Sequence, residues 1–118
     1  MKKEIKLEGF VYANGVHWCD ASIYNNGYFK RLALVRRSGI IEWDVEPKTL
    51  PKSVTGIIEK DAERYKKEFL NQWNRLPIYG KYQRILDCLT ITEFVEACKF
   101  KTAEEAIREY EKIYFERC

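Results

Sequence analysis

The sequence predicts an α+β protein, in which a four-stranded antiparallel β-meander is followed by three to four helices packed on one face. Two observations carry this prediction. Residues 1–46 hold three turn dipeptides between segments rich in β-forming residues. Residues 51–118 are instead rich in helix formers, with apolar side chains at helical spacing. A chain of 118 residues has the size of one domain, so we expect these halves to form a single domain.

Three turns define the expected strands. The first half contains Asn14-Gly15, Asn26-Gly27 and Ser38-Gly39. An Asn-Gly pair is typical of a type I′ hairpin turn, because both central residues of that turn need a positive φ. Since the connections are short, consecutive strands should pair with one another in order. The expected strands are Ile5–Ala13, Val16–Asn25, Tyr28–Arg37 and Ile40–Val45.

The pattern of side chains along these strands predicts one apolar face and one mixed face. We assume here that each turn is a two-residue loop, which fixes the register of every pair of strands. The residues that then form the centre of the apolar face are Phe10, Cys19, Leu34, Trp43, Ala21, Leu32 and Val45. The opposite face mixes Trp18, Ala33 and Val35 with charged residues. We expect the long helix to cover the apolar face.

Helix signals are local and clear in the second half. Pro51 suits the first turn of a long helix, which should end near Asn74 because Pro77 follows. Its apolar stripe is Val54, Ile57, Ile58, Tyr65, Phe69, Trp73 and Leu76. Capping-box patterns at Thr90 and Thr102 predict helices over 91–100 and 103–116. Residues 81–91 stay open between a helix and a strand.

Composition and motifs exclude several classes of function. The net charge of +3 is too small for a dedicated nucleic-acid binder. Four cysteines without a C-x-x-C pair, and one histidine, give no metal site and indicate reduced thiols. No glycine-rich phosphate loop occurs, so we expect no cofactor. The sequence starts without a signal peptide and has no membrane-spanning run, which favours a cytoplasmic protein without a membrane partner.

Candidate catalytic groups all have simpler interpretations. His17 and Cys19 share a strand face and could form a nucleophile pair. The predicted register buries Cys19, however, and a thiol in apolar surroundings is inert. Asp20 and Asp44 flank Ala33 on the mixed face and could act as an acid–base pair, but we interpret them as solvated or arginine-paired carboxylates. We therefore expect no enzyme, and a small hydrolase is only a third hypothesis.

The mixed face is the main candidate for function. Either helices from the second half cover it, or it is an exposed apolar patch with charged edges, which is typical of a protein interface. Both interpretations stay open, as does the choice between a monomer and a homodimer. On the second interpretation, aromatic anchors and rim charges bind the partner. These residues are Trp18, Tyr24, Phe29, Arg31, Arg37, Glu42 and Asp44.

The alternative hypothesis is a small nucleic-acid-binding regulator. It would use basic residues of the third strand and the long helix, namely Arg36, Lys60, Arg64 and Lys67. The last two helices loosely resemble a helix-turn-helix pair, but the final one carries more acidic than basic residues. Because phosphate groups need a basic surface, the sequence favours a protein partner over nucleic acid.

The general character of the chain suggests one kind of protein. The hairpin-rich segment "FVYANGVHWCDASIYNNGY" and the charged helical segment "TAEEAIREYEKIY" occur in a compact chain without catalytic motifs. In these respects the chain resembles small lone-domain proteins of phages and other mobile elements. The resemblance implies a protein that binds and blocks a host defence enzyme, as anti-CRISPR inhibitors do.

Overall fold

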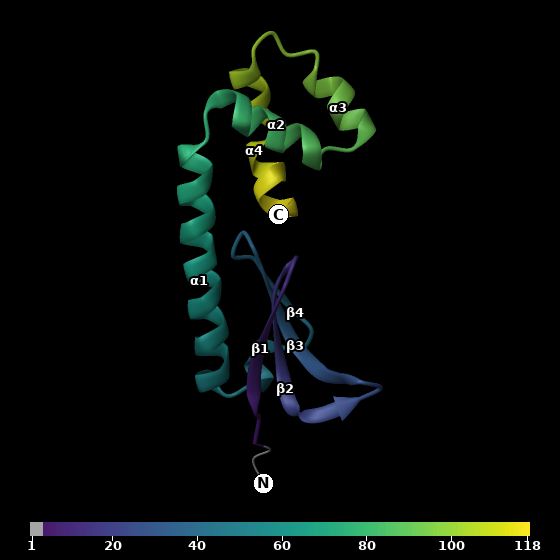
Figure 1. Cartoon of the computed structure of the whole chain (residues 1–118), viewed down its shortest axis with the longest axis vertical. Helices are drawn as coiled ribbons and strands as arrows, with labels where there is room; N and C mark the ends of the chain where they lie inside the picture. Colours follow the sequence, from purple (N-terminus) through teal and green to yellow (C-terminus); the bar gives the residue numbers. More distant parts are fainter. Residues whose placement is uncertain (1–3) are drawn as a thin grey trace. The chain divides into compact units, whose positions relative to one another are not determined.

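The computed structural model describes residues 4–118 and confirms the α+β class (Figure 1). Four strands form one antiparallel sheet in the order β1-β2-β3-β4. They are β1 (Leu7–Tyr12), β2 (Gly15–Asn25), β3 (Tyr28–Arg36) and β4 (Ile41–Trp43). A single 3₁₀ turn, η1 (Pro47–Thr49), leads into the helices. These are α1 (Lys52–Arg75), α2 (Ile78–Cys88), α3 (Ile91–Ala97) and α4 (Ala103–Arg117). Residues 81–88, left open by the sequence, therefore belong to a helix.

The chain divides into two compact units, and the boundary lies inside α1. The first unit ends at Phe69 and the second runs from Leu70 to Cys118. The apolar stripe predicted along the long helix serves both units. Val54 and Ile58 belong to the core of the first, whereas Trp73 packs in the second.

The core of the first unit lies between the sheet and the first part of α1. Its buried members are Val16, Leu32, Ala33 and Val35 from the sheet and Val54, Ile58 and Ala62 from the helix. The three helical residues are four positions apart, which places them on one side of α1. Trp18 lies against the same core and donates from Nε1 to Asp61 Oδ2 at 3.0 Å. The helix therefore covers the sheet face that carries Trp18, Ala33 and Val35.

This is the face that the sequence predicted to be mixed, so the predicted placement of the long helix is wrong. Cys19 and Leu34, which we expected beneath the helix, are buried but do not belong to the core cluster at α1. Trp43, which we expected beside Leu34, packs instead against the core cluster at α1. Both differences follow from the register of the strands.

The β3–β4 connection is longer than predicted by one residue. Arg36 N donates to Ile40 O, and Gly39 N donates to Arg36 O, each at 2.8 Å. These bonds enclose a three-residue loop whose last residue, Gly39, has a φ of +89°. Trp43 consequently pairs with Ala33 and not with Leu34. A shift by one residue turns every side chain of β4 to the other face.

Two irregularities also shift the β2–β3 register. The Asn26-Gly27 turn is as predicted, with φ values of +51° and +85°. Beyond it, the register changes between Asp20 and Tyr24 and again between Trp18 and Cys19, so Cys19 pairs with Arg31. Asp20 Oδ1 accepts hydrogen bonds from Ser22 N at 3.0 Å and Ser22 Oγ at 2.6 Å. This buried carboxylate thus supports the larger bulge.

The second unit packs around an aromatic centre. Trp73 has its ring centroid 4.7 Å from that of Tyr114 and 5.4 Å from that of Phe115. The capping box predicted at the start of α3 is present, since Glu93 N donates to Thr90 Oγ1 and Thr90 N donates to Glu93 Oε1. At the start of α4, Thr102 accepts from Glu105 N at 3.2 Å. Local capping chemistry therefore fixes where both helices begin.

Glu93 also joins α3 to α4 within this unit. Arg117 holds its carboxylate with two hydrogen bonds of 2.6 and 2.8 Å and donates to Cys88 O at 3.0 Å. The bonds from Arg117, followed by the one from Thr90 N, lower the pKa of Glu93 from 4.5 to about 2. Because the folded pKa lies below the ordinary value, this carboxylate stabilises the fold above pH 4.5 and ceases to do so as pH falls towards 2.

We therefore predict an acid-sensitive contribution that Glu93→Gln removes. In urea unfolding followed by circular dichroism, the wild type should lose more stability than the variant between pH 4.5 and about 2. The variant should be the less stable of the two at neutral pH. Glu104→Gln, an exposed change in the first turn of α4, is the control and should keep the wild-type pH profile. Parallel profiles for wild type and Glu93→Gln would contradict the prediction.

Candidate functional site

The candidate site is the sheet face that α1 does not cover, called here the open face. Cross-strand pairing places His17 opposite both Phe10 and Leu34, and Leu34 opposite Glu42. Side-chain contacts add the residues around this row. The open face consists of Phe10, Tyr12, His17, Cys19, Tyr24, Phe29, Arg31, Leu34, Arg36, Glu42 and Asp44.

Aromatic side chains form one part of the open face. The rings of Phe29 and Phe10 stack with their centroids 5.9 Å apart. The rings of Phe29 and Tyr24 make a T-shaped contact, with their centroids 5.4 Å apart. Phe29 remains 38% exposed and Tyr24 67% exposed. Tyr12 packs edge-on against the imidazole of His17 at 4.6 Å. The connected cluster of Tyr24, Phe29 and Phe10 therefore extends from the β2–β3 turn, whereas the Tyr12–His17 pair lies towards the β1–β2 turn.

Ion pairs form the other part. The guanidinium of Arg31 holds the carboxylate of Asp44 through Nε and through Nη2, the latter at 3.1 Å from Oδ1. Arg36 Nη1 lies 3.4 Å from Glu42 Oε1. The hydrogen bond to Asp44 raises the pKa of Arg31 further above its ordinary range. Each arginine on this face is thus matched by a carboxylate, and the pairs leave no excess of positive charge for a phosphate group.

The His17 imidazole is held in one tautomer. Its Nδ1 lies 3.4 Å from Arg31 Nη1, and its Nε2 lies 3.0 Å from Asn14 Oδ1. Since a guanidinium only donates, Nδ1 accepts and Nε2 carries the proton. Burial and the Arg31 charge lower the pKa of His17, which favours this neutral form. His17 therefore acts as a link between Asn14 and Arg31 that fixes the guanidinium on the face.

Cys19 does not contact the imidazole. Its Sγ donates to the main-chain oxygen of His17 at 3.7 Å, and burial raises the pKa of the thiol. A nucleophile pair needs a hydrogen bond between the thiol and the base, as well as a lowered thiol pKa. The geometry of these two residues provides neither.

The structure gathers most of the predicted partner-binding residues. Phe29, Arg31, Glu42 and Asp44 lie on the open face, and Tyr24 contacts Phe29. Arg37 lies in the β3–β4 loop, where its Nε donates to Ala13 O.

Two sequence-based placements need correction. Trp18 lies on the opposite face, beneath α1. The register change between Trp18 and Cys19 and the longer β3–β4 loop bring Arg31, Glu42 and Asp44 to the open face, but they leave Trp18 on the face that the sequence predicted for it. Asp20 and Asp44 are not a pair either. Asp20 is buried beside the bulge, whereas Asp44 binds Arg31 on the open face.

Sequence reasoning missed Phe10 and Tyr12 as surface residues. Phe10 was assigned to the face expected beneath the helix, and Tyr12 lies two residues further along the same strand, so their aromatic character indicated a core. The signal that was available is their alternation on β1 together with the nearby Phe29. This pattern indicates a surface cluster only once the register is known, because the register places the ring centroids of Phe10 and Phe29 5.9 Å apart.

The residues of the nucleic-acid hypothesis do not form one surface. Arg36 is on the open face with Glu42, whereas Lys60, Arg64 and Lys67 lie on α1, which packs on the other face. Arg64 contacts Asp61 at 2.8 Å and Glu68 at 3.9 Å, and its guanidinium lies over the ring of Tyr65. The structure therefore separates Arg36 from the three cations of α1, which share one side of that helix.

Comparison with known proteins returned no relative. No family model, curated protein or solved structure matches the chain. Among residues 4–118, no group of three or more histidine, cysteine or acidic side chains is placed to hold a metal ion. No helix in that same range has the length and apolar character needed to cross a membrane.

Proposed function

We propose that this protein is a non-enzymatic binding module that recognises another protein through the open face. The observation that carries the proposal is the aromatic cluster of Phe10, Tyr24 and Phe29, in which Tyr24 and Phe29 are exposed beside the Arg31–Asp44 and Arg36–Glu42 ion pairs. Exposed aromatic groups that adjoin polar groups are the usual centre of a protein interface.

The two parts of the face suit different tasks in binding. The rings of Phe29 and Tyr24 supply apolar area that a partner can desolvate at low entropic cost, since each ring already rests on a neighbour. The Arg31–Asp44 pair is held by His17, so its donors and acceptors have fixed positions. Fixed polar groups around an apolar centre select a partner and set its orientation.

Inhibition of a host defence enzyme is the biological role that we favour. The resemblance to small proteins of phages and mobile elements points to this role, and a binding module can inhibit by covering a functional surface of its target. Binding to nucleic acid is the alternative, and it predicts a steep fall in affinity between low and moderate salt. Shifted DNA or RNA bands at low salt, lost on Arg36→Ala, would favour that alternative.

The proposal is tested with the double variant Tyr24→Ala/Phe29→Ala in pull-downs from a host lysate, followed by binding measurements with the purified partner. We expect the variant to bind at least about tenfold more weakly, because one hot-spot aromatic contributes about 2 kcal/mol or more. Tyr79→Ala is the matched control, since Tyr79 is 83% exposed on α2. If the double variant folds and binds as tightly as the control, the open face is not the interface.

A further inference from the structure

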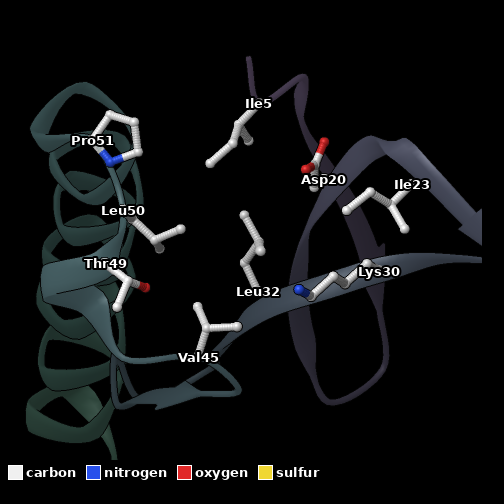
Figure 2. A pocket seen from close by; sticks show the side chains of 9 residues that line it. All are labelled: Ile5, Asp20, Ile23, Lys30, Leu32, Val45, Thr49, Leu50 and Pro51. Carbon is white, nitrogen blue, oxygen red and sulfur yellow. The ribbon is translucent and has the colours of Figure 1, made fainter. Parts of the chain in front are cut away.

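A concave site lies in the first unit, and none of its lining residues belongs to the open face. It is a cavity of about 500 Å³ between the β2–β3 hairpin and the segment that leads from β4 into α1 (Figure 2). Its apolar lining comes from six side chains, which are Ile5, Ile23, Leu32, Val45, Leu50 and Pro51. Asp20 and Lys30 add two charged groups on the hairpin side. A mostly apolar cavity of this size with a few polar groups is the usual form of a small-molecule site.

The two charged groups have different roles. Asp20 is buried, and its Oδ1 already accepts three hydrogen bonds, from Lys6 N, Ser22 N and Ser22 Oγ. This carboxylate is therefore engaged in holding the strand irregularity. Lys30 lies opposite Asp20 in the backbone register of β2 and β3. Figure 2 shows its Nζ directed into the cavity towards Leu32. No ion pair found among residues 4–118 includes Lys30.

We propose that this cavity binds a small monocarboxylate with an aliphatic body. The ammonium of Lys30 would donate to the carboxylate of the ligand, a charge-assisted hydrogen bond that gains strength beside apolar groups. The aliphatic body would lie against Ile5, Val45 and Leu50, where each methylene removed from water strengthens binding about fourfold. An amine would meet the like charge of Lys30, and an alcohol would lack the ion pair.

The site also couples the ligand to the junction before α1. Val45 and Leu50 belong to the segment between β4 and α1, whereas Leu32 and Lys30 belong to β3. A ligand that contacts both would hold this segment against the sheet. Binding should therefore raise the melting temperature, because a ligand that binds only the folded chain stabilises it. This proposal does not depend on the open face being an interface.

The test uses octanoate as the probe and the full chain. Calorimetry and amide chemical shifts in an NMR titration should show saturable binding, with the largest shifts at Lys30, Val45 and Leu50. Lys30→Met keeps the length of the side chain and removes the charge, and it should weaken octanoate binding by about tenfold or more. Lys30→Arg should stay within about threefold of wild type because it keeps the cation. Lys60→Met, an exposed change on α1, is the matched control and should bind as wild type does.

Other results would overturn the proposal. Octylamine or octanol binding as tightly as octanoate would show that Lys30 does not select a carboxylate. Equal binding by a folded Lys30→Met variant would remove the central contact. Shifts confined to Phe29 and its neighbours, or shifts that do not saturate, would mean that the probe meets the open face or binds as a detergent. A failed octanoate titration would leave the pull-down test of the open face unaffected, so the two proposals can fail separately.

Discussion

Gly39→Ala should destabilise the protein by about 3 kcal/mol, because both the backbone and the space at this residue exclude a side chain. Its φ of +89° is a conformation that residues with a Cβ rarely adopt. An added Cβ would lie 2.6 Å from Ala62 O and 2.8 Å from Lys66 N. Both atoms belong to the backbone of α1, so they cannot move without moving the helix or the loop.

Gly56→Ala is the matched control, with the same chemical change on α1. An added Cβ there meets no atom within 4 Å, and alanine has the higher helix propensity. We expect this variant to gain about 0.5–1 kcal/mol in urea or thermal unfolding. If Gly39→Ala and Gly56→Ala changed the free energy of unfolding by the same amount, the conclusion that the β3–β4 loop packs closely against α1 would be wrong.

The same loop explains where sequence reasoning failed. Ser38-Gly39 is a turn, as predicted, but a loop of two or three residues fits the same dipeptide. The choice between them decides which face of the sheet receives Ile41 and Trp43. In the three-residue loop that forms, Gly39 packs closely against α1. That contact is between residues distant in sequence, so no local pattern could have disclosed it.

The helices were easier to predict because their signals are local. The apolar spacing of α1 and the Thr90 and Thr102 caps mark those helices within a few residues. The irregularity of β2 between Asp20 and Tyr24 has a weaker sequence signal. Asp20 and Ser22 are residues that bond to nearby main chain, but such residues occur in many regular strands as well.

Arg31 and Asp44 were correctly expected on the same face of the sheet, although the register used for that prediction was wrong. Arg31 and Asp44 were expected on the face that carries Trp18, and both lie on the other face. The bulge near Cys19 moves Arg31 across the sheet, and the longer β3–β4 loop moves Asp44 across it too. Two separate one-residue shifts thus keep this pair together while they separate it from Trp18. Tyr24, Phe29 and the two charged residues were therefore expected on one face, whereas Phe10 and Tyr12 were not expected beside them.

Trp73→Ala should cost about 3–5 kcal/mol of unfolding free energy, the range for removing a buried large aromatic side chain. Trp73 is only 4% exposed, and its ring packs against Tyr114 and Phe115 of α4. The second unit buries few other large side chains, so the cavity left behind could not be filled by its neighbours.

Urea unfolding followed by far-ultraviolet circular dichroism measures this loss, and a conservative change tests its cause. Trp73→Phe keeps an aromatic ring between α1 and α4 and should cost clearly less than Trp73→Ala. Tyr79→Ala, an exposed change on α2, should stay within about 0.5 kcal/mol of wild type. A Trp73→Ala variant as stable as Tyr79→Ala would mean that aromatic packing does not hold the second unit together. Its stability would then have to come mainly from its buried aliphatic side chains, such as Ile85 and Ile107, because the helix caps and the exposed Arg117–Glu93 pair are individually weak.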